Sequence, residues 1–322
     1  MNRLTEAIVR KAWNAAYRLK ASPRDGASPI MDDLEPQIHF TERFYPYHFL
    51  TPEILARQLY FNEQKIPVRY IRDHRPYNNP VYPAYYGLVC LNHGGADDLS
   101  AARAMADFLM AESDKKDDAL FWHIHTTLPQ YHLQRPFPSG LAQGLCASLF
   151  VRLFHHTQSR GWLDAACAAV RGMLLPVDQG GMLRQTPERL PWVEEYPGET
   201  PSFVLNGFLF SLIALLEVES TANVLFPIRS QALLESLLSS FPLYRHGRYL
   251  FYDRLYYRFC NPQYMGLHTL LLHHLYRSTA LEQVYSLACD LHRDVHWNLY
   301  MQSFGTTPSD QHRAWLHAEL GS

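Results

Sequence analysis

The sequence predicts a mainly α-helical fold: an incomplete α/α toroid of helical hairpins, with short β-hairpin inserts lining a cleft at one end. The main observation is a repeat of four apolar segments, each with a glycine near its start. These glycines recur about every 60 residues, at Gly87, Gly144, Gly207 and Gly266. A short polar break and an amphipathic segment follow each apolar segment. Two helices per repeat of this length are typical of stacked helical hairpins.

The two helices of each repeat differ in composition. The first helix is apolar on nearly every side, as expected of a helix that is buried all round. The second helix has one polar face, so we expect it to lie outside the first. The predicted second helices span residues 101–111, 162–174, 228–239 and 281–292.

The segments that precede the first helices are rich in aromatic and polar residues and alternate like strands in places. They span residues 120–134, 182–196 and 244–258. We expect these segments to form the walls of a cleft, with Tyr86, Gln143 and Asn206, each directly before a repeat glycine, on its floor. The alternative is that the glycines permit close helix packing and that Gln143 and Asn206 act as helix caps.

The first 70 residues contain further predicted elements. In order, these are a helix at 2–20, an extended segment at 21–50, a helix at 52–64 that begins with Thr51 as N-cap, and a strand near 68–71. We therefore divide the chain into an N-terminal part, 1–64, packed on a toroidal domain, 65–322.

The composition is that of an ordinary globular protein. Of the 322 residues 47% are hydrophobic and 19% are charged, and the net charge of −2 gives no signal for binding nucleic acid or membranes. The aromatic content is 13%, with 20 tyrosines, which suits stacking on sugar rings. These features favour a carbohydrate partner over a nucleic acid.

The cysteines and the N-terminus indicate the compartment. The five cysteines are odd in number and have no CxxC spacing, as expected of reduced thiols in an intracellular protein. The N-terminal segment is interrupted by charges, unlike a signal peptide, and no run of about 18 uncharged apolar residues predicts a membrane span. We expect a cytoplasmic protein; the oligomeric state is open, a homodimer included.

One stretch, residues 192–217, joins an acidic loop to an apolar helix. Glu194, Glu195 and Tyr196 stand in the loop, and Ser202 is placed to be the N-cap of the helix. Because helix N-termini favour anions, this arrangement indicates a site for a negatively charged substrate. The alternative is a solvated loop that caps a structural helix.

Within this stretch, residues 192–215, W-V-E-E-Y-P-G-E-T-P-S-F-V-L-N-G-F-L-F-S-L-I-A-L, resemble the C-terminal domain of D-glucuronyl C5-epimerases. These enzymes convert glucuronate to iduronate within heparosan-type polysaccharides. Weaker similarities follow the family's order at 67–88, 139–144 and 252–268, and together the resemblance covers about 67–274. The resemblance implies an isomerase that acts on a glucuronate-containing polysaccharide.

The resemblance also implies roles for individual residues. Glu195 and Tyr264 match the two groups that act on opposite faces of the sugar, and Tyr196 and Tyr252 match two further active-site tyrosines. His268 keeps the family's spacing of four residues from Tyr264. The family has an arginine three residues after the tyrosine equivalent to Tyr252. Here Arg254 is two residues after it and Arg258 is six, so both are candidates.

The residue types suit this chemistry. Inverting C5 of a uronate removes a proton next to a carboxylate and creates an enolate, which Arg254 or Arg258 would stabilise. Glu195 would transfer a proton if burial and the neighbouring Glu194 raise its pKa. In the alternative, one of these two carboxylates pairs with Arg184 or Arg189. The reaction needs no metal and no cofactor, and no histidine cluster has the spacing of a metal site.

The predicted site therefore has two parts. The catalytic candidates are Glu195, Tyr264, Tyr196, Tyr252 and Arg254, and the substrate-binding candidates are Tyr86, Gln143, Asn206, Arg258, His268 and Glu194. Two other functions remain open at this point. A polysaccharide lyase would remove the same C5 proton and then expel the substituent at C4, and a non-catalytic carbohydrate-binding scaffold would keep the fold alone.

Overall fold

The computed structural model describes residues 51–302, apart from 58 and 71–75. These residues form two compact units: a large unit from residue 51 to 239 and a small unit from 240 to 302. The helix predicted at 2–20 and the extended segment at 21–50 lie outside the described residues. The division at residue 64 therefore stays a prediction.

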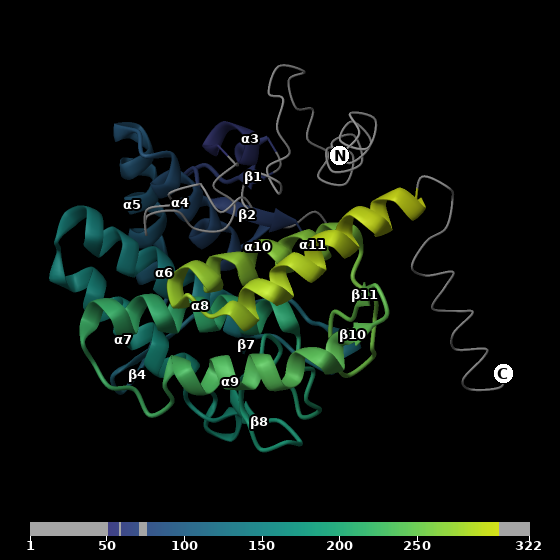
Figure 1. Ribbon diagram of the computed structural model, residues 1–322. Coiled ribbons are helices and arrows are strands. Elements are labelled where there is room, and N and C mark those ends of the chain that lie inside the picture. The colour runs from purple at the N-terminus through teal and green to yellow at the C-terminus, as the bar shows by residue number, and fades with distance from the viewer. Residues whose placement is uncertain (1–50, 58, 71–75, 303–322) are drawn as a thin grey trace. The chain divides into compact units, whose positions relative to one another are not determined.

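Helix pairs dominate the described residues (Figure 1), as the repeat predicts. The large unit contains α3 (Pro52–Ala56), α4 (Val81–His93), α5 (Ala96–Ala111), α6 (Gly140–Thr157), α7 (Arg160–Met173), α8 (Leu205–Ala222) and most of α9 (Ser230–Ser240). The small unit contains α10 (Pro262–Thr279) and α11 (Glu282–Gln302). In three of the four repeats the first helix packs against the second: α4 on α5, α6 on α7 and α10 on α11.

Short antiparallel strand pairs precede the first helices of the repeats. They are β1 (Tyr60–Phe61), β2 (Pro67–Tyr70) and β3 (Pro76–Tyr77) in one sheet, then β4 (Asp114–Lys116) with β5 (Ala119–Phe121), β6 (His123–Ile124) with β7 (Phe137–Pro138), β8 (Leu183–Gln185) with β9 (Pro191–Val193), and β10 (Arg245–His246) with β11 (Tyr249–Leu250). Strands β8 to β11 lie within the predicted inserts at 182–196 and 244–258, and β2 lies at the strand predicted near 68–71, whereas β4 and β7 lie just outside the insert predicted at 120–134.

The centre of the large unit is the contact between α6 and α8, which run side by side (Figure 1). A Cβ atom added at Gly144 would lie 2.9 Å from the carbonyl carbon of Phe210, closer than real side chains approach. The hydroxyl of Ser211 lies 3.0 Å from the carbonyl oxygen of Gly140 and 2.8 Å from that of Gly207. Small residues on both helices therefore permit a close contact, as the packing interpretation of Gly144 predicts.

The predicted helix at 52–64 is wrong beyond its first residues. It ends at Ala56 because the following residues form a hairpin instead, in which Tyr60 pairs with Val68 and Phe61 with Pro67. The side chain of Asn62 accepts hydrogen bonds from the N–H groups of Gln64 and Ile66 and so fixes the turn. A local side-chain bond of this kind competes successfully with helix formation.

Helix α8 is the one described helix that is long and apolar enough to span a membrane. Within its most apolar window, 67% of the residues are buried inside the protein. Its apolar surface is therefore accounted for by the core of the large unit. The five cysteines are free thiols, and four of them are buried.

Replacing Gly144 by alanine tests the close contact of α6 and α8. Gly144→Ala should lower the free energy of unfolding by about 1–3 kcal/mol, because backbone atoms of Phe210 occupy the space that the new methyl group needs. The control is Gly161→Ala in α7, where nothing lies within 4 Å of the added atom. This variant should be more stable by about 0.5–1 kcal/mol. Urea unfolding measures both, and changes of equal sign would contradict the packing argument.

Candidate active site

Glu194 organises the loop between β9 and α8. Its carboxylate is fully buried and accepts hydrogen bonds from the Ser202 hydroxyl at 2.8 Å, the Ser202 N–H at 3.1 Å and the Phe203 N–H at 2.9 Å. The Nε atom of Arg184 lies 3.4 Å from it, so the pairing with Arg184 is present for this carboxylate. Glu194 therefore joins the start of the loop to Ser202 and Phe203 at its end, which favours a structural role over direct substrate binding.

The predicted N-cap at Ser202 is wrong for the same reason. Because the Ser202 hydroxyl donates to Glu194, it does not reach the first turn of α8. The helix begins at Leu205, after Val204, which has no capping side chain. Phe203 lies between them with a φ of 48°, a left-handed conformation that is uncommon outside glycine. The first N–H groups of α8 are thus left for another acceptor.

Glu195 lies against that first turn. Its side chain is only 2% exposed, and a Cβ atom at Gly207 would lie 2.4 Å from the Cβ of Glu195 and 2.6 Å from its Oε2. Only glycine at 207 leaves room for this carboxyl group. The Asn206 side chain, the Gly207 N–H and the Tyr196 side chain are its hydrogen-bonding neighbours. Glu195 therefore occupies the position of an acceptor at the helix N-terminus.

Two buried oxygen atoms at this point have no hydrogen-bond partner among the described residues. They are Oε2 of Glu195, a residue that is 2% exposed, and Oδ1 of Asn206, a residue that is 4% exposed. Unpartnered buried polar atoms are rare in folded proteins and are costly. A ligand with hydroxyl groups would satisfy both, so their position together marks a candidate site.

Burial changes the acidity of both glutamates. It raises the pKa of Glu195 to about 7, although Tyr196, the Gly207 N–H and Asn206 act in the opposite direction. It also raises the pKa of Glu194 to about 7, against the stabilising effect of Ser202, Arg184 and Phe203 on its charged form. A carboxyl group with a pKa near neutrality both accepts and donates protons readily, which is what a general acid or base needs.

Aromatic side chains surround the loop. Tyr196 is partly exposed, and its ring lies 4.4 Å from that of Tyr131 and 6.4 Å from that of Phe137. Next to the loop is a cavity of about 550 Å³, lined by Arg184, by Leu183, by residues 176–178 and by Pro197, Gly198 and Glu199. Sugar rings stack on aromatic surfaces such as the one formed by Tyr196, Tyr131 and Phe137.

The small unit gathers the other candidates. The ring of Tyr264, in the first turn of α10, lies 5.1 Å from that of Tyr252 in an edge-to-face arrangement. Asn261 caps the helix by accepting the Tyr264 N–H at 2.9 Å. Tyr264 is 38% exposed, so its phenol group is accessible. The structure thus brings together two tyrosines that the resemblance assigns to the active site.

An arginine is held beside these tyrosines. Asp253 is fully buried and accepts from Arg258 Nε at 3.0 Å and from Arg258 Nη2 at 2.7 Å. The Arg258 guanidinium lies over the ring of Tyr252, 5.5 Å from its centre. Arg254 is half-buried on the same loop. Asp253 was not among the predicted site residues, because its role depends on a fold of the loop that local sequence does not show.

Gln143 lies in the interior and not on the floor of a cleft, so this prediction is wrong. Its amide accepts the Trp122 N–H at 3.0 Å and donates to the carbonyl oxygens of Leu120 at 2.9 Å and Ala169 at 3.0 Å. It joins α6 to β5 and α7. The side chain is therefore structural.

His268 also differs from expectation. His268 is fully buried with its Nδ1 atom 4.0 Å from the Cys260 sulfur, and burial lowers its pKa to about 4. It is neutral and is not open to a substrate. Tyr86 is half-buried and packs edge-on against Phe61, and burial raises the pKa of its phenol to about 12. Its role in substrate binding stays a prediction. Within the described ranges, no group of three or more His, Cys, Asp and Glu side chains is arranged to hold a metal ion.

The two clusters lie within one matched segment of the sequence. The family model described as D-glucuronyl C5-epimerase C-terminus matches residues 116–291. The chain belongs to this family. The resemblance carried by residues 192–215 is thereby confirmed.

Two relatives give the extent of the similarity. An uncharacterized protein of Methanocaldococcus jannaschii is 28% identical over 186 residues, which are 56% of this chain and 59% of that protein. The D-glucuronyl C5-epimerase of Caenorhabditis elegans is 38% identical over 80 residues, which are 25% of this chain and 13% of that protein. The chain therefore spans little more than half of the first relative and a small part of the second.

Solved structures establish the fold class. Cellobiose 2-epimerase from Spirochaeta thermophila is similar with a TM-score of 0.50 and 12% identity, over 74% of this chain and 64% of that one. A D-mannose isomerase is similar with a TM-score of 0.52 and 13% identity, over 91% of this chain and 85% of that one. The prediction of a mainly α fold of the α/α-toroid class is confirmed.

The raised pKa of Glu195 predicts how stability depends on pH. A carboxyl group with a pKa near 4.3 in the unfolded chain and about 7 in the folded protein binds more protons when folded. The free energy of unfolding should therefore fall as the pH rises through this window. Glu195→Gln should reduce that fall, so that the variant gains stability relative to wild type at pH 8 compared with pH 5.

Urea unfolding at pH 5 and pH 8 measures this difference. The matched control is Glu199→Gln, an exposed carboxylate of the same loop, which should leave the pH dependence as it is in the wild type. Equal pH dependence in Glu195→Gln and wild type would show that Glu195 does not titrate as its burial requires.

Proposed function

We propose that this protein epimerises C5 of glucuronate residues within a polysaccharide and so converts D-glucuronate to L-iduronate. Family membership and fold support an isomerase-type enzyme that acts on carbohydrate. The observation that carries the finer proposal is the Glu195 carboxyl group. It is buried, has a pKa of about 7, and has one oxygen without a partner among the described residues.

The proposed reaction moves one proton off C5 and returns one from the other face. A base takes the C5 proton, the C–H electron pair is delocalised into the carboxylate as an enolate, and an acid then protonates C5. Glu195 is the proposed group for one face, and the Tyr264 phenol is the proposed group for the other. The reaction is redox-neutral, and side chains alone supply both proton transfers.

The enolate carries two negative charges, so a fixed cation near the substrate carboxylate is needed. We assign this role to Arg258 in preference to Arg254. Asp253 fixes the plane of the Arg258 guanidinium with two hydrogen bonds, and a fixed guanidinium binds a carboxylate with less loss of entropy. Tyr252, Tyr196 and Asn206 would complete the contacts to the sugar. A cytoplasmic location remains a prediction.

Exchange with solvent tests the proposal directly. A glucuronate-containing polymer incubated with the protein in deuterium oxide should gain deuterium at C5 and show iduronate signals by NMR, with no change in chain length. Glu195→Gln and Tyr264→Phe should each lower the exchange rate about 10²–10⁴-fold. Tyr257→Phe, an exposed tyrosine of the small unit, is the control and should retain activity.

Other outcomes of this experiment would contradict the proposal. Shorter chains with an unsaturated, ultraviolet-absorbing end would identify a lyase. Binding of the polymer without exchange, at any pH between 5 and 9 and for every uronate polymer tested, would identify a binding scaffold.

The choice of arginine has its own test. Arg258→Gln should lower kcat/KM at least about tenfold, because the substrate carboxylate loses a charge-assisted bidentate partner. Arg254→Gln, a change of equal charge in the same loop, should have a smaller effect. Steady-state kinetics at several polymer concentrations compares them, and a larger loss in Arg254→Gln would reverse the assignment.

A further inference from the structure

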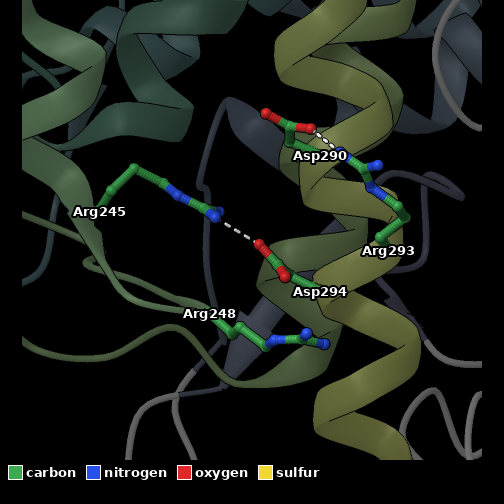
Figure 2. A pocket seen from close by; sticks show the side chains of 5 residues that line it. All are labelled: Arg245, Arg248, Asp290, Arg293 and Asp294. Carbon is green, nitrogen blue, oxygen red and sulfur yellow. Dashed lines mark hydrogen bonds and ion pairs between the residues drawn. The ribbon is translucent and has the colours of Figure 1, made fainter.

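The small unit has a second cluster of charged side chains, separate from Asp253 and Arg258. A cavity of about 280 Å³ is lined by Arg245 and Arg248 from the β10–β11 hairpin and by Asp290, Arg293 and Asp294 from α11. We call it the arginine cavity. Figure 2 shows Arg245 and Arg248 extending from the hairpin towards α11. Three arginines against two aspartates leave an excess of positive charge.

The ion pairs in the arginine cavity orient one guanidinium without using all of its donors. Arg245 Nη2 donates to Asp294, and Arg293 donates to Asp290, as Figure 2 shows. The other terminal nitrogen of Arg245, Nη1, is buried and has no hydrogen-bond acceptor among the described residues. A buried donor of this charge is costly when it has no acceptor. An anionic ligand with oxygen atoms would supply one.

The β10–β11 hairpin connects the arginine cavity to the loop that carries Tyr252 and Arg258. After β11 the chain stays extended, because the Cys260 N–H bonds the Leu250 carbonyl at 2.7 Å and the Tyr252 N–H bonds the Arg258 carbonyl at 2.6 Å. Across the hairpin Arg245 pairs with Leu250, which precedes Tyr252 by two residues along the chain. Tyr252, Arg258 and Tyr264 do not line the arginine cavity, so a group bound in it makes different contacts from a group bound at Tyr252.

We propose that the arginine cavity binds the carboxylate of a second uronate on the same polysaccharide chain. This inference rests on the proposed function, which supplies a polymer with repeated carboxylates. Asp294 holds Arg245 in place, and Arg245 Nη1 donates to the carboxylate, with Arg248 at the entrance. The cavity thereby gives the protein a preference for long acidic chains over short ones.

Binding measurements with chains of different length test this inference without requiring turnover. By isothermal titration calorimetry, an oligosaccharide with several uronates should bind the wild type more tightly than one with a single uronate. Arg245→Gln and Arg248→Gln should each weaken binding of the long chain about tenfold and leave binding of the short one unchanged. Arg160→Gln, which removes an equal charge from an exposed ion pair on α7, should change neither.

A variant that is expected to bind the long chain more tightly strengthens the test. Asp290→Asn removes a negative charge from the cavity and should strengthen binding of the long chain, whereas a cavity that only clamps the hairpin to α11 predicts no gain. Because Arg245→Gln removes one ion pair of the buried Asp294, thermal unfolding is measured in parallel, and Arg248→Gln carries the test if Arg245→Gln unfolds.

The outcomes separate this inference from the proposed function. Wild-type binding of the long chain by a folded Arg248→Gln would overturn the inference, and so would equal weakening of the long and the short chain. C5 exchange by such a variant would leave the epimerase proposal intact. Length-dependent binding through Arg245 and Arg248 without any C5 exchange would support the cavity and refute the proposed reaction.

Discussion

The approach of Glu195 to Gly207 is the contact on which the candidate site depends. The first turn of α8 lies so near the loop that even a methyl group at 207 would occupy the place of the Glu195 side chain. The same helix is brought close to α6 at Gly144, and Ser211 bridges carbonyl groups of both helices. The core therefore fixes the helix, and the helix fixes the surroundings of the carboxyl group. A site built on packed helices holds its groups more precisely than one built on free loops.

Two neighbouring glutamates have different tasks because their partners differ. Glu194 is surrounded by donors from Ser202, Phe203 and Arg184, so its charge is used to close the loop. Glu195 has fewer partners, and one of its oxygens remains without any among the described residues. Burial raises the pKa of both, and this desolvation disfavours the charged forms in the folded state. Such a cost is typical of functional sites, where reactivity is retained at the expense of stability.

The small unit follows the same principle with opposite charge. A buried aspartate orients an arginine twice: Asp253 holds the exposed Arg258 beside the tyrosines, and Asp294 holds the half-buried Arg245 at the hairpin. In each case the carboxylate limits the motion of a flexible side chain, so that less entropy is lost when a ligand binds. Both arginines lie on one continuous segment, from β10 to the residues before α10. Their repetition along it suits a ligand that carries carboxylates at intervals.

The sequence by itself determined the four repeats of two helices, the α/α-toroid class and the family, because periodic apolar patterns and a long motif are local properties of the chain. It also named Glu195, Tyr252 and Tyr264, through the resemblance. Only the tertiary structure decided the partners of the buried polar groups. Gln143 bonds residues 120, 122 and 169, and Ser202 bonds Glu194 in place of capping α8. A buried polar side chain takes the partners that folding places next to it, and spacing along the chain does not specify them.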